Sequence, residues 1–190
     1  TYHFDDPRHA ANLAALMPAI TGASAVLVEA GPDEEKALKT QIARDPSTMV
    51  ITEGPTLNQQ LPPEVWTQLS NAMSARGIPA FMTAKFKPWY VLTLLSIPPC
   101  AMLQMTQEPE GLDRLVTRAA GEAGVPAAAL EPYDTLFKIF GSLTEAELTE
   151  MLVSTLAIEP QAEDYFTTLV DSYFAGESRD FGDIFGHQIV

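Results

Sequence analysis

Ala25-Val26-Leu27-Val28-Glu29 is a short β-branched run that ends on a carboxylate. Four apolar residues are too few for an independent helix, so the run predicts a buried central strand. Two other stretches, Thr1-Tyr2-His3 and Ala128-Ala129-Leu130-Glu131, also end a hydrophobic run on a polar residue. Ligands of α/β proteins collect at the carboxyl ends of the strands. We therefore expect the histidine and the two glutamates to converge on one edge of a sheet.

The segments around these runs have helical spacing, and Pro or an acidic cap marks several of their starts. One exception is the stretch from Thr48 to Leu57, which predicts a small β-hairpin. We expect Pro18 to disturb the first helix. The helices are predicted at 6–22, 33–44, 62–77, 87–95, 112–124, 144–156 and 160–176.

This order of elements predicts an α/β fold with a small central mixed sheet flanked by many helices and a mainly helical C-terminal third. At 190 residues the chain is long enough to bury one core. We expect residues 1–190 to form a single domain that is incomplete at both ends. At the amino-terminal end the chain opens inside a predicted strand without an initiating Met.

The charge balance restricts the partners. A formal net charge of −14 with only 11 basic residues argues against nucleic acid, which needs clustered Lys and Arg. The same charge disfavours an anionic membrane surface and suits neutral or cationic ligands. The longest apolar stretch, Trp89 to Ile97, is much shorter than the ~20 residues that cross a bilayer.

Cys100 is the only cysteine, which excludes an intrachain disulfide. Its Pro98-Pro99 context indicates a packed, inert thiol.

Several short motifs occur in a characteristic order along the chain. They are Thr1-Tyr2-His3, Val26 to Glu29, Thr56-Leu57, Leu61 to Glu64, Lys87-Pro88-Trp89, Gly111-Leu112-Asp113 and Val125 to Glu131. In this order they resemble the TraB/GumN family, which is related to the TIKI metalloproteases. The resemblance covers nearly all of the chain and implies an α/β fold of two related halves, each with a Gly-x-x-His motif. It also implies a divalent-metal-dependent hydrolase or protease activity, and it suggests a periplasmic or cell-envelope location.

The resemblance assigns site residues one by one. His3 matches the histidine of the first Gly-x-x-His motif, whose glycine would precede Thr1, and Glu29 matches the acidic residue that ends the next strand. Asp113 and Glu131 match later elements. The chain departs from the family pattern at its other end, where His187 lacks the spacing of the second motif.

We therefore expect a peptide or small-molecule hydrolase with His3 and Glu29 as ligands of Mn²⁺, Co²⁺ or Zn²⁺. Glu29 would be the ligand or the general base. Glu131, Asp113 and His9 are the expected substrate-binding residues. The alternative from another functional class is a non-catalytic regulatory protein that holds a peptide or other ligand in the same cleft.

Structural interpretations stay open for the same side chains. Glu29, Glu131 and Asp113 each precede or begin a helix, where a carboxylate caps the end or is stabilised by the helix dipole. His9 could be a solvated loop residue. Lys87, Arg114 and Arg118 could orient a substrate carboxylate, or the two arginines could form a solvated helical face. Trp66, Trp89 and Tyr90 are expected to fill the core.

Overall fold

The computed structural model describes residues 4–104 and 110–177. These residues form two compact units. The first unit comprises 4–40, 110–135 and 169–177, and the second comprises 41–104 and 136–168. Each unit has a hydrophobic cluster of its own.

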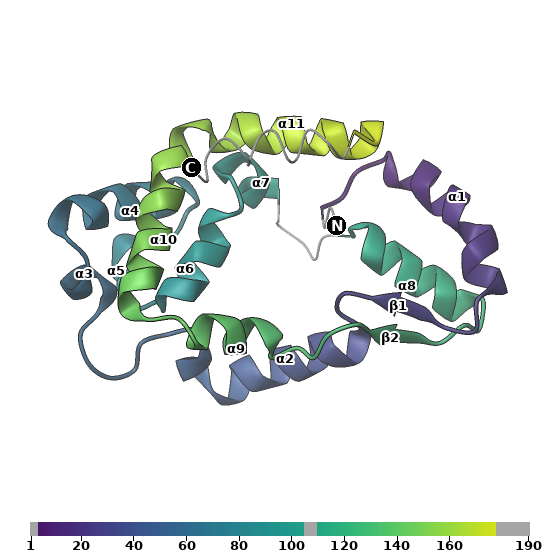
Figure 1. The fold of residues 1–190 in the computed structure, drawn as a ribbon, viewed down its shortest axis with the longest axis horizontal. Helices are drawn as coiled ribbons and strands as arrows, with labels where there is room; N and C mark the ends of the chain where they lie inside the picture. The colour runs from purple at the N-terminus through teal and green to yellow at the C-terminus, as the bar shows by residue number, and fades with distance from the viewer. Residues whose placement is uncertain (1–3, 105–109, 178–190) are drawn as a thin grey trace. The chain divides into compact units, whose positions relative to one another are not determined.

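The first unit consists of helices around a small sheet (Figure 1). Helix α8 packs against α1 and against both strands. The buried residues Ile20, Ala119, Ala120 and Val125 form the cluster between them. Its elements are α1 (His9–Gly22), β1 (Val26–Val28), α2 (Pro32–Arg44), α8 (Leu112–Glu122), β2 (Ala127–Ala129) and the end of α11 (Ala162–Ala175).

The two strands pair in parallel, with Val26 opposite Ala127 and Val28 opposite Ala129. The predicted α/β class is confirmed, although the sheet of the described residues is purely parallel and not mixed. The prediction of a buried central strand is wrong for the described residues, because their sheet has only two strands and β1 is buried on one face. Val28 is buried, but Leu27 is 59% exposed because successive side chains of a strand point to opposite faces. Only one face of β1 therefore packs against the rest of the unit.

Helix α1 begins at His9, three residues later than the sequence predicts. The backbone N–H of His9 donates to the carbonyl of Asp6, and the Asp6 carboxylate accepts from the N–H of Arg8 at 2.8 Å. Pro18 lies inside the helix but does not end it. A proline removes one backbone hydrogen bond, and packing of Met17 and Ile20 in the first unit's cluster supports the last turn.

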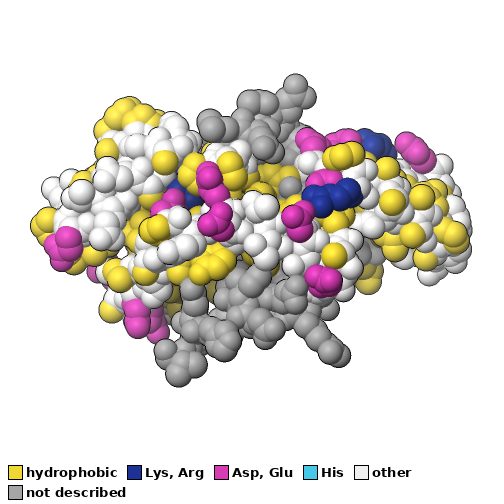
Figure 2. All heavy atoms as spheres, turned by 90° about the horizontal axis from the view of Figure 1, so that it is seen from above, with side chains coloured by type: hydrophobic (Ala, Val, Ile, Leu, Met, Phe, Trp, Pro, Cys, Tyr) yellow, Lys and Arg dark blue, Asp and Glu magenta, His cyan; other side chains and the backbone are white. Residues whose placement is uncertain are grey.

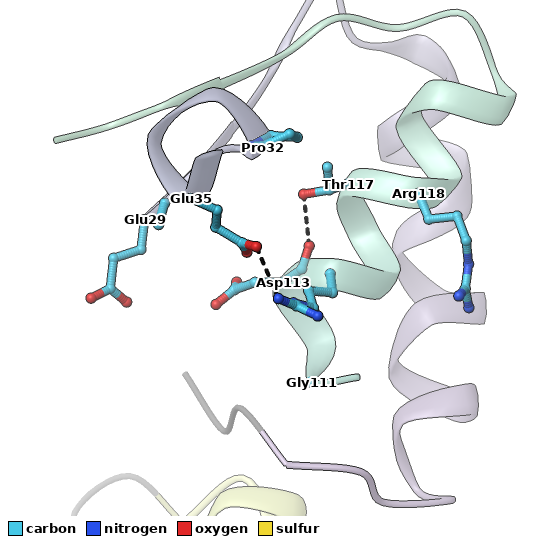
Figure 3. Close-up of a pocket in the computed structure, with 9 residues that line it drawn as sticks. Glu29, Pro32, Glu35, Gly111, Asp113, Thr117 and Arg118 are labelled. Atoms are coloured by element: carbon cyan, nitrogen blue, oxygen red, sulfur yellow. Dashed lines mark hydrogen bonds and ion pairs between the residues drawn. The ribbon is translucent and has the colours of Figure 1, made fainter. Parts of the chain in front are cut away.

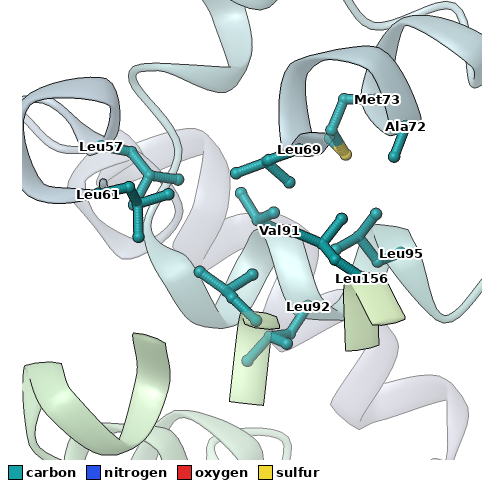
Figure 4. Close-up of a cluster of buried hydrophobic side chains, with 10 residues drawn as sticks. Leu57, Leu61, Leu69, Ala72, Met73, Val91, Leu92, Leu95 and Leu156 are labelled. Carbon is teal, nitrogen blue, oxygen red and sulfur yellow. The ribbon is translucent and has the colours of Figure 1, made fainter. Parts of the chain in front are cut away.

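The second unit is built from helices, among which α6 packs against α4 and α10. Figure 4 shows Leu69 and Met73 of α4 beside Val91 and Leu95 of α6. This cluster confirms the buried helix that the sequence predicts after Lys87. The elements are η1 (Pro46–Thr48), α3 (Leu57–Gln60), α4 (Pro63–Ala75), α5 (Ala80–Thr83), α6 (Pro88–Leu95), α7 (Pro99–Gln104), α9 (Thr135–Gly141), α10 (Glu145–Ile158), η2 (Glu159–Gln161) and the start of α11.

The aromatic side chains of the second unit pack as expected. Trp66 is partly buried against the cluster. The Trp89 ring lies 5.6 Å from the Tyr90 ring and 5.1 Å from that of Phe137, centroid to centroid. Trp89 and Tyr90 are thus partly buried by contacts with other aromatic rings.

The hairpin predicted from Thr48 to Leu57 is wrong. The Asp45 carboxylate accepts from the backbone N–H of Ser47 and caps a 3-10 turn at Pro46–Thr48. The Gln59 side chain accepts from the N–H of Thr56, so Thr56 starts helix α3 and not a strand. Val50 forms an isolated antiparallel bridge with Phe86. Local capping thus competes with the hairpin, and the β partner comes from a distant segment.

The C-terminal third is helical, as predicted. Helix α10 starts with the expected capping box of Thr144 and Glu147. No helix within residues 4–104 and 110–177 is both long enough and apolar enough to cross a bilayer.

Candidate functional site

A cavity of about 400 Å³ opens in the first unit beside the carboxyl end of β1. Its walls are the β1–α2 connection, the first turn of α2 and the first two turns of α8 (Figure 3). The lining residues are Glu29, Ala30, Pro32, Glu35, Gly111, Asp113, Arg114, Thr117 and Arg118. This is the strand-end position at which α/β proteins commonly bind ligands.

Glu29 reaches this cavity because β1 ends on the buried Val28 and the chain turns directly into α2. Gly31 packs closely in this turn. A Cβ atom there would lie 3.3 Å from the backbone nitrogen of Ala129 in β2, so a larger residue would require β2 to shift by a few tenths of an ångström. The tight packing of the turn on β2 fixes where Glu29 leaves the sheet.

Asp113 lies in the first turn of α8, behind Gly111 at the N-cap. Figure 3 shows its carboxylate pointing toward the side on which Glu29 lies. Asp113 also affects Tyr173. Burial, and then the negative charge of Asp113, raise the pKa of the Tyr173 phenol above its ordinary value.

Both arginines of the cavity are held by carboxylates. Arg114 Nη2 donates to Glu35 Oε2 at 2.9 Å, which joins α8 to the first turn of α2. Arg118 forms an ion pair with Glu110. Such partly exposed pairs each contribute about 0–1 kcal/mol, but they fix the direction of the guanidinium groups.

The expected site residues divide as follows. Glu29 and Asp113 line the same cavity. Glu131 is exposed beyond β2 and is not among the lining residues. His3 and His187 lie outside the described residues. The structure thus joins two of the expected side chains and leaves the contribution of His3 as a prediction.

His9 is not a solvated loop residue. It is the first residue of α1 and only 1% exposed, its Nε2 lies 3.0 Å from the carbonyl oxygen of Phe4, and its ring packs 5.1 Å from that of Phe174. His9 borders a second, shallower cavity of about 370 Å³ together with Asp5, Asp6 and Glu110. These contacts give His9 a structural role at the start of the first helix.

Sequence reasoning did not single out Glu35 or Tyr173. Glu35 is one of three consecutive acidic residues in α2, and no local pattern distinguishes it from Asp33 and Glu34. Tyr173 comes from a helix far along the chain, and its pattern indicates only a packed face. Their roles depend on which elements pack together.

The described residues do not by themselves fit a catalytic metal. Within 4–104 and 110–177 there is no group of three or more His, Cys, Asp or Glu side chains that could hold an ion, whereas such sites normally use about three protein ligands. Cys100 is also a poor candidate for a catalytic nucleophile. Burial, and then the nearby Glu163, raise the pKa of its thiol, which lowers the fraction of reactive thiolate.

Comparison with known proteins gives one positive result. A model of the TraB/PrgY/gumN family matches residues 1–187 of the chain. No curated protein and no solved structure matches the chain.

Proposed function

The chain belongs to the TraB/PrgY/gumN family, and from that premise we propose that it is a hydrolase of peptide bonds or related amide and ester bonds. The reaction would take place in the cavity beside β1. The observation that carries the proposal is that Glu29 and Asp113, from separate elements, line one cavity at the carboxyl end of the sheet.

The chemistry assigned to Glu29 is general base catalysis. Hydrolysis requires a group that takes a proton from the attacking water, and a carboxylate within hydrogen-bonding distance can do this. Glu29 is exposed at the end of β1, so water and substrate can both reach its carboxylate. Asp113 supplies a second carboxylate to the same cavity, where it would contact the substrate.

The proposal includes a divalent transition metal with His3 and Glu29 as ligands. The ion would be Mn²⁺, Co²⁺ or Zn²⁺. The described residues supply no complete ligand set, so the ion would require ligands from outside them. For this reason no chemical step is assigned to the metal.

The first test compares Glu29→Gln with Glu122→Gln, using fluorescein-labelled casein as substrate. Glu122 is an exposed residue in the last turn of α8, so its variant matches the change in charge outside the cavity. We expect Glu29→Gln to reduce the rate by about 10²- to 10⁴-fold, the usual contribution of a general base. Equal rates for the two variants would contradict the role of Glu29.

The second test concerns the metal. We expect the purified chain to contain a transition metal that is lost in His3→Ala and retained in His187→Ala, measured by elemental analysis. A wild-type chain that binds no Mn²⁺, Co²⁺ or Zn²⁺ after incubation with each ion would rule out the metal part of the proposal.

A second candidate function is a non-catalytic protein that holds a peptide in this cavity. It is favoured by the lack of a three-ligand group within the described part of the chain. Peptide binding by the wild-type chain without any cleavage would support this function over the hydrolase.

A further inference from the structure

The charge of the main cavity limits what it can bind. Three carboxylates line it, from Glu29, Glu35 and Asp113, against the two guanidinium groups of Arg114 and Arg118. The formal charge of these side chains is therefore negative. The remaining wall consists of Ala30, Pro32, Gly111 and the uncharged polar Thr117.

The two arginines already have carboxylate partners. Glu35 accepts a hydrogen bond from Arg114 at 2.9 Å, and Glu110 is paired with Arg118. A guanidinium has further N–H donors, but a ligand carboxylate would have to compete with the protein carboxylate beside it. The charge of the lining therefore favours a cationic ligand group over the substrate carboxylate that Arg114 and Arg118 could orient.

The charge of the rest of the chain also favours a cationic ligand. Its net charge is −14, and acidic side chains outnumber basic ones on the face that Figure 2 displays. A negative field of this kind attracts cations over distances of about one Debye length, roughly 8 Å at physiological ionic strength. The field around the chain and the lining of the cavity thus both favour a positively charged ligand.

We propose that this cavity binds a positively charged group of its ligand, an ammonium or guanidinium, between the carboxylates of Glu29 and Asp113. The inference rests on the proposed function only in taking this cavity as the substrate site. It specifies that the substrate is a peptide held by its cationic group. That group comes either from the free amino terminus or from a Lys or Arg side chain.

The experiment uses pentaalanine probes that carry a fluorophore on a C-terminal amide. One probe has a free amino terminus, a second is N-acetylated, and a third is N-acetylated with its central Ala replaced by Lys. A fourth, N-acetylated with Glu at that position, is the anionic control. Fluorescence polarisation with the wild-type chain measures binding, and chromatography of the same samples measures cleavage.

We expect one of the two cationic probes to bind at least about 10-fold more tightly than the acetylated and Glu probes, because hydrogen bonds between charged groups are about twice as strong as neutral ones. A preference for the free-amine probe identifies the amino terminus, and a preference for the Lys probe identifies a basic side chain. Equal binding of all probes, tighter binding of the Glu probe, or no binding of any probe would overturn the inference.

A variant ties the preference to this cavity. Asp113→Asn keeps the shape of the side chain and removes its charge, so we expect the preferred cationic probe to bind about 10-fold more weakly, with binding of the acetylated probe unchanged. Glu122→Gln, at the other end of α8, should change neither. An equal loss for cationic and acetylated probes would assign Asp113 a purely structural role and overturn the inference.

The two proposals can fail separately. Cationic selectivity without cleavage would reject the hydrolase and retain this inference. Cleavage of all four probes at equal rates, with equal affinities, would retain the hydrolase and reject the inference.

Discussion

Asp113 and Tyr173 are electrostatically coupled although they are 60 positions apart in the sequence. Burial is the main reason for the raised pKa of Tyr173, and the charge of Asp113 is the second. We predict that Asp113→Asn lowers the pKa of Tyr173 but leaves it above the ordinary value of 10.0, because burial remains. The phenolate absorbance of each chain, minus that of the same chain carrying Tyr173→Phe, measures this pKa. An unchanged value would show that the two side chains do not interact.

Gly31 is the residue whose substitution should most directly disturb the main cavity. In Gly31→Ala the new Cβ would lie 2.9 Å from the Glu34 carboxylate, which can move, and 3.3 Å from the backbone nitrogen of Ala129, which cannot move easily. We predict a loss of about 1–3 kcal/mol in the free energy of unfolding, typical of overpacking, measured by urea denaturation.

Gly121→Ala is the matched control for Gly31→Ala. This glycine lies inside α8, and no heavy atom would come within 4 Å of its Cβ. We expect the substitution to stabilise the chain by about 0.5–1 kcal/mol, since alanine is the better helix former. A neutral or stabilising Gly31→Ala would show that the β1–α2 turn does not need glycine.

The sequence could predict site residues that follow a strong local pattern and no others. Glu29 ends a clear strand and Asp113 begins a clear helix, so both positions are set by neighbouring residues. The burial of His9 depends on Phe174, which comes from a remote helix. Glu131 lies one residue beyond Leu130, the position opposite Glu29 in the strand register. That one-residue offset changes the direction of a side chain, and composition gives no sign of it.

At the scale of elements, Arg76 joins three helices of the second unit. Its side chain is fully buried, and its guanidinium donates to the carbonyl oxygens of Ala72, Leu95 and Ile97 and, through both terminal nitrogens, to Glu159. It thereby satisfies carbonyls at the ends of α4 and α6 and links them to η2.

We predict that Arg76→Ala lowers the free energy of unfolding by about 3–5 kcal/mol, because it leaves the Glu159 carboxylate and several buried carbonyls unsatisfied. Arg76→Lys keeps the charge but cannot bind Glu159 in a bidentate manner, so its loss should be smaller yet clear. Urea denaturation measures both. If the lysine variant is as stable as the wild type, charge alone suffices and the fork geometry is unimportant.

Helix α10 should respond to pH through its capping box. The backbone N–H of Thr144 donates to the Glu147 carboxylate at 2.7 Å, and this bond is the main reason for the lowered pKa of Glu147. A lowered pKa in the folded state means that the contribution is complete above the ordinary value of 4.5 and is lost as the pH falls through the folded-state pKa.

We therefore predict that the difference in thermal midpoint between wild type and Glu147→Ala shrinks as the pH falls from 7 to below 4.5. Glu150→Ala, on an exposed position of the same helix, should show little of this dependence. A constant difference for Glu147→Ala would mean that its charge does not support the cap.

Helices were predictable in this chain because their end signals are local. Pro63, Pro88 and Thr144 each stand at the observed start of a helix. The hairpin prediction failed because residues 48–57 have β-forming composition but also contain the capping side chain of Thr56 and follow Pro46. Propensity is a weak signal when a cap is available nearby.

At the scale of the whole chain, neither compact unit is a continuous segment. The first unit takes three stretches of the described chain, and the second takes two. A search for linkers rich in Gly or Ser therefore finds no boundary, because each crossing lies inside or beside regular structure. The strand pairing of β1 with β2 joins residues about 100 positions apart, so only the three-dimensional contacts define the units.

The two hydrophobic clusters are expected to stabilise the helices of their own units to different degrees. Among the described residues, the second unit's cluster contains ten buried residues, including Leu69, whereas the first unit's cluster contains four, including Ile20. A Leu or Ile to Ala change in a core costs about 2–5 kcal/mol, and opening of a region follows its own buried contacts. We predict that Leu69→Ala reduces amide hydrogen-exchange protection mainly in α4, α6 and α10, and Ile20→Ala mainly in α1 and α8. Equal losses in all five helices for either variant would show that the clusters unfold as one cooperative core.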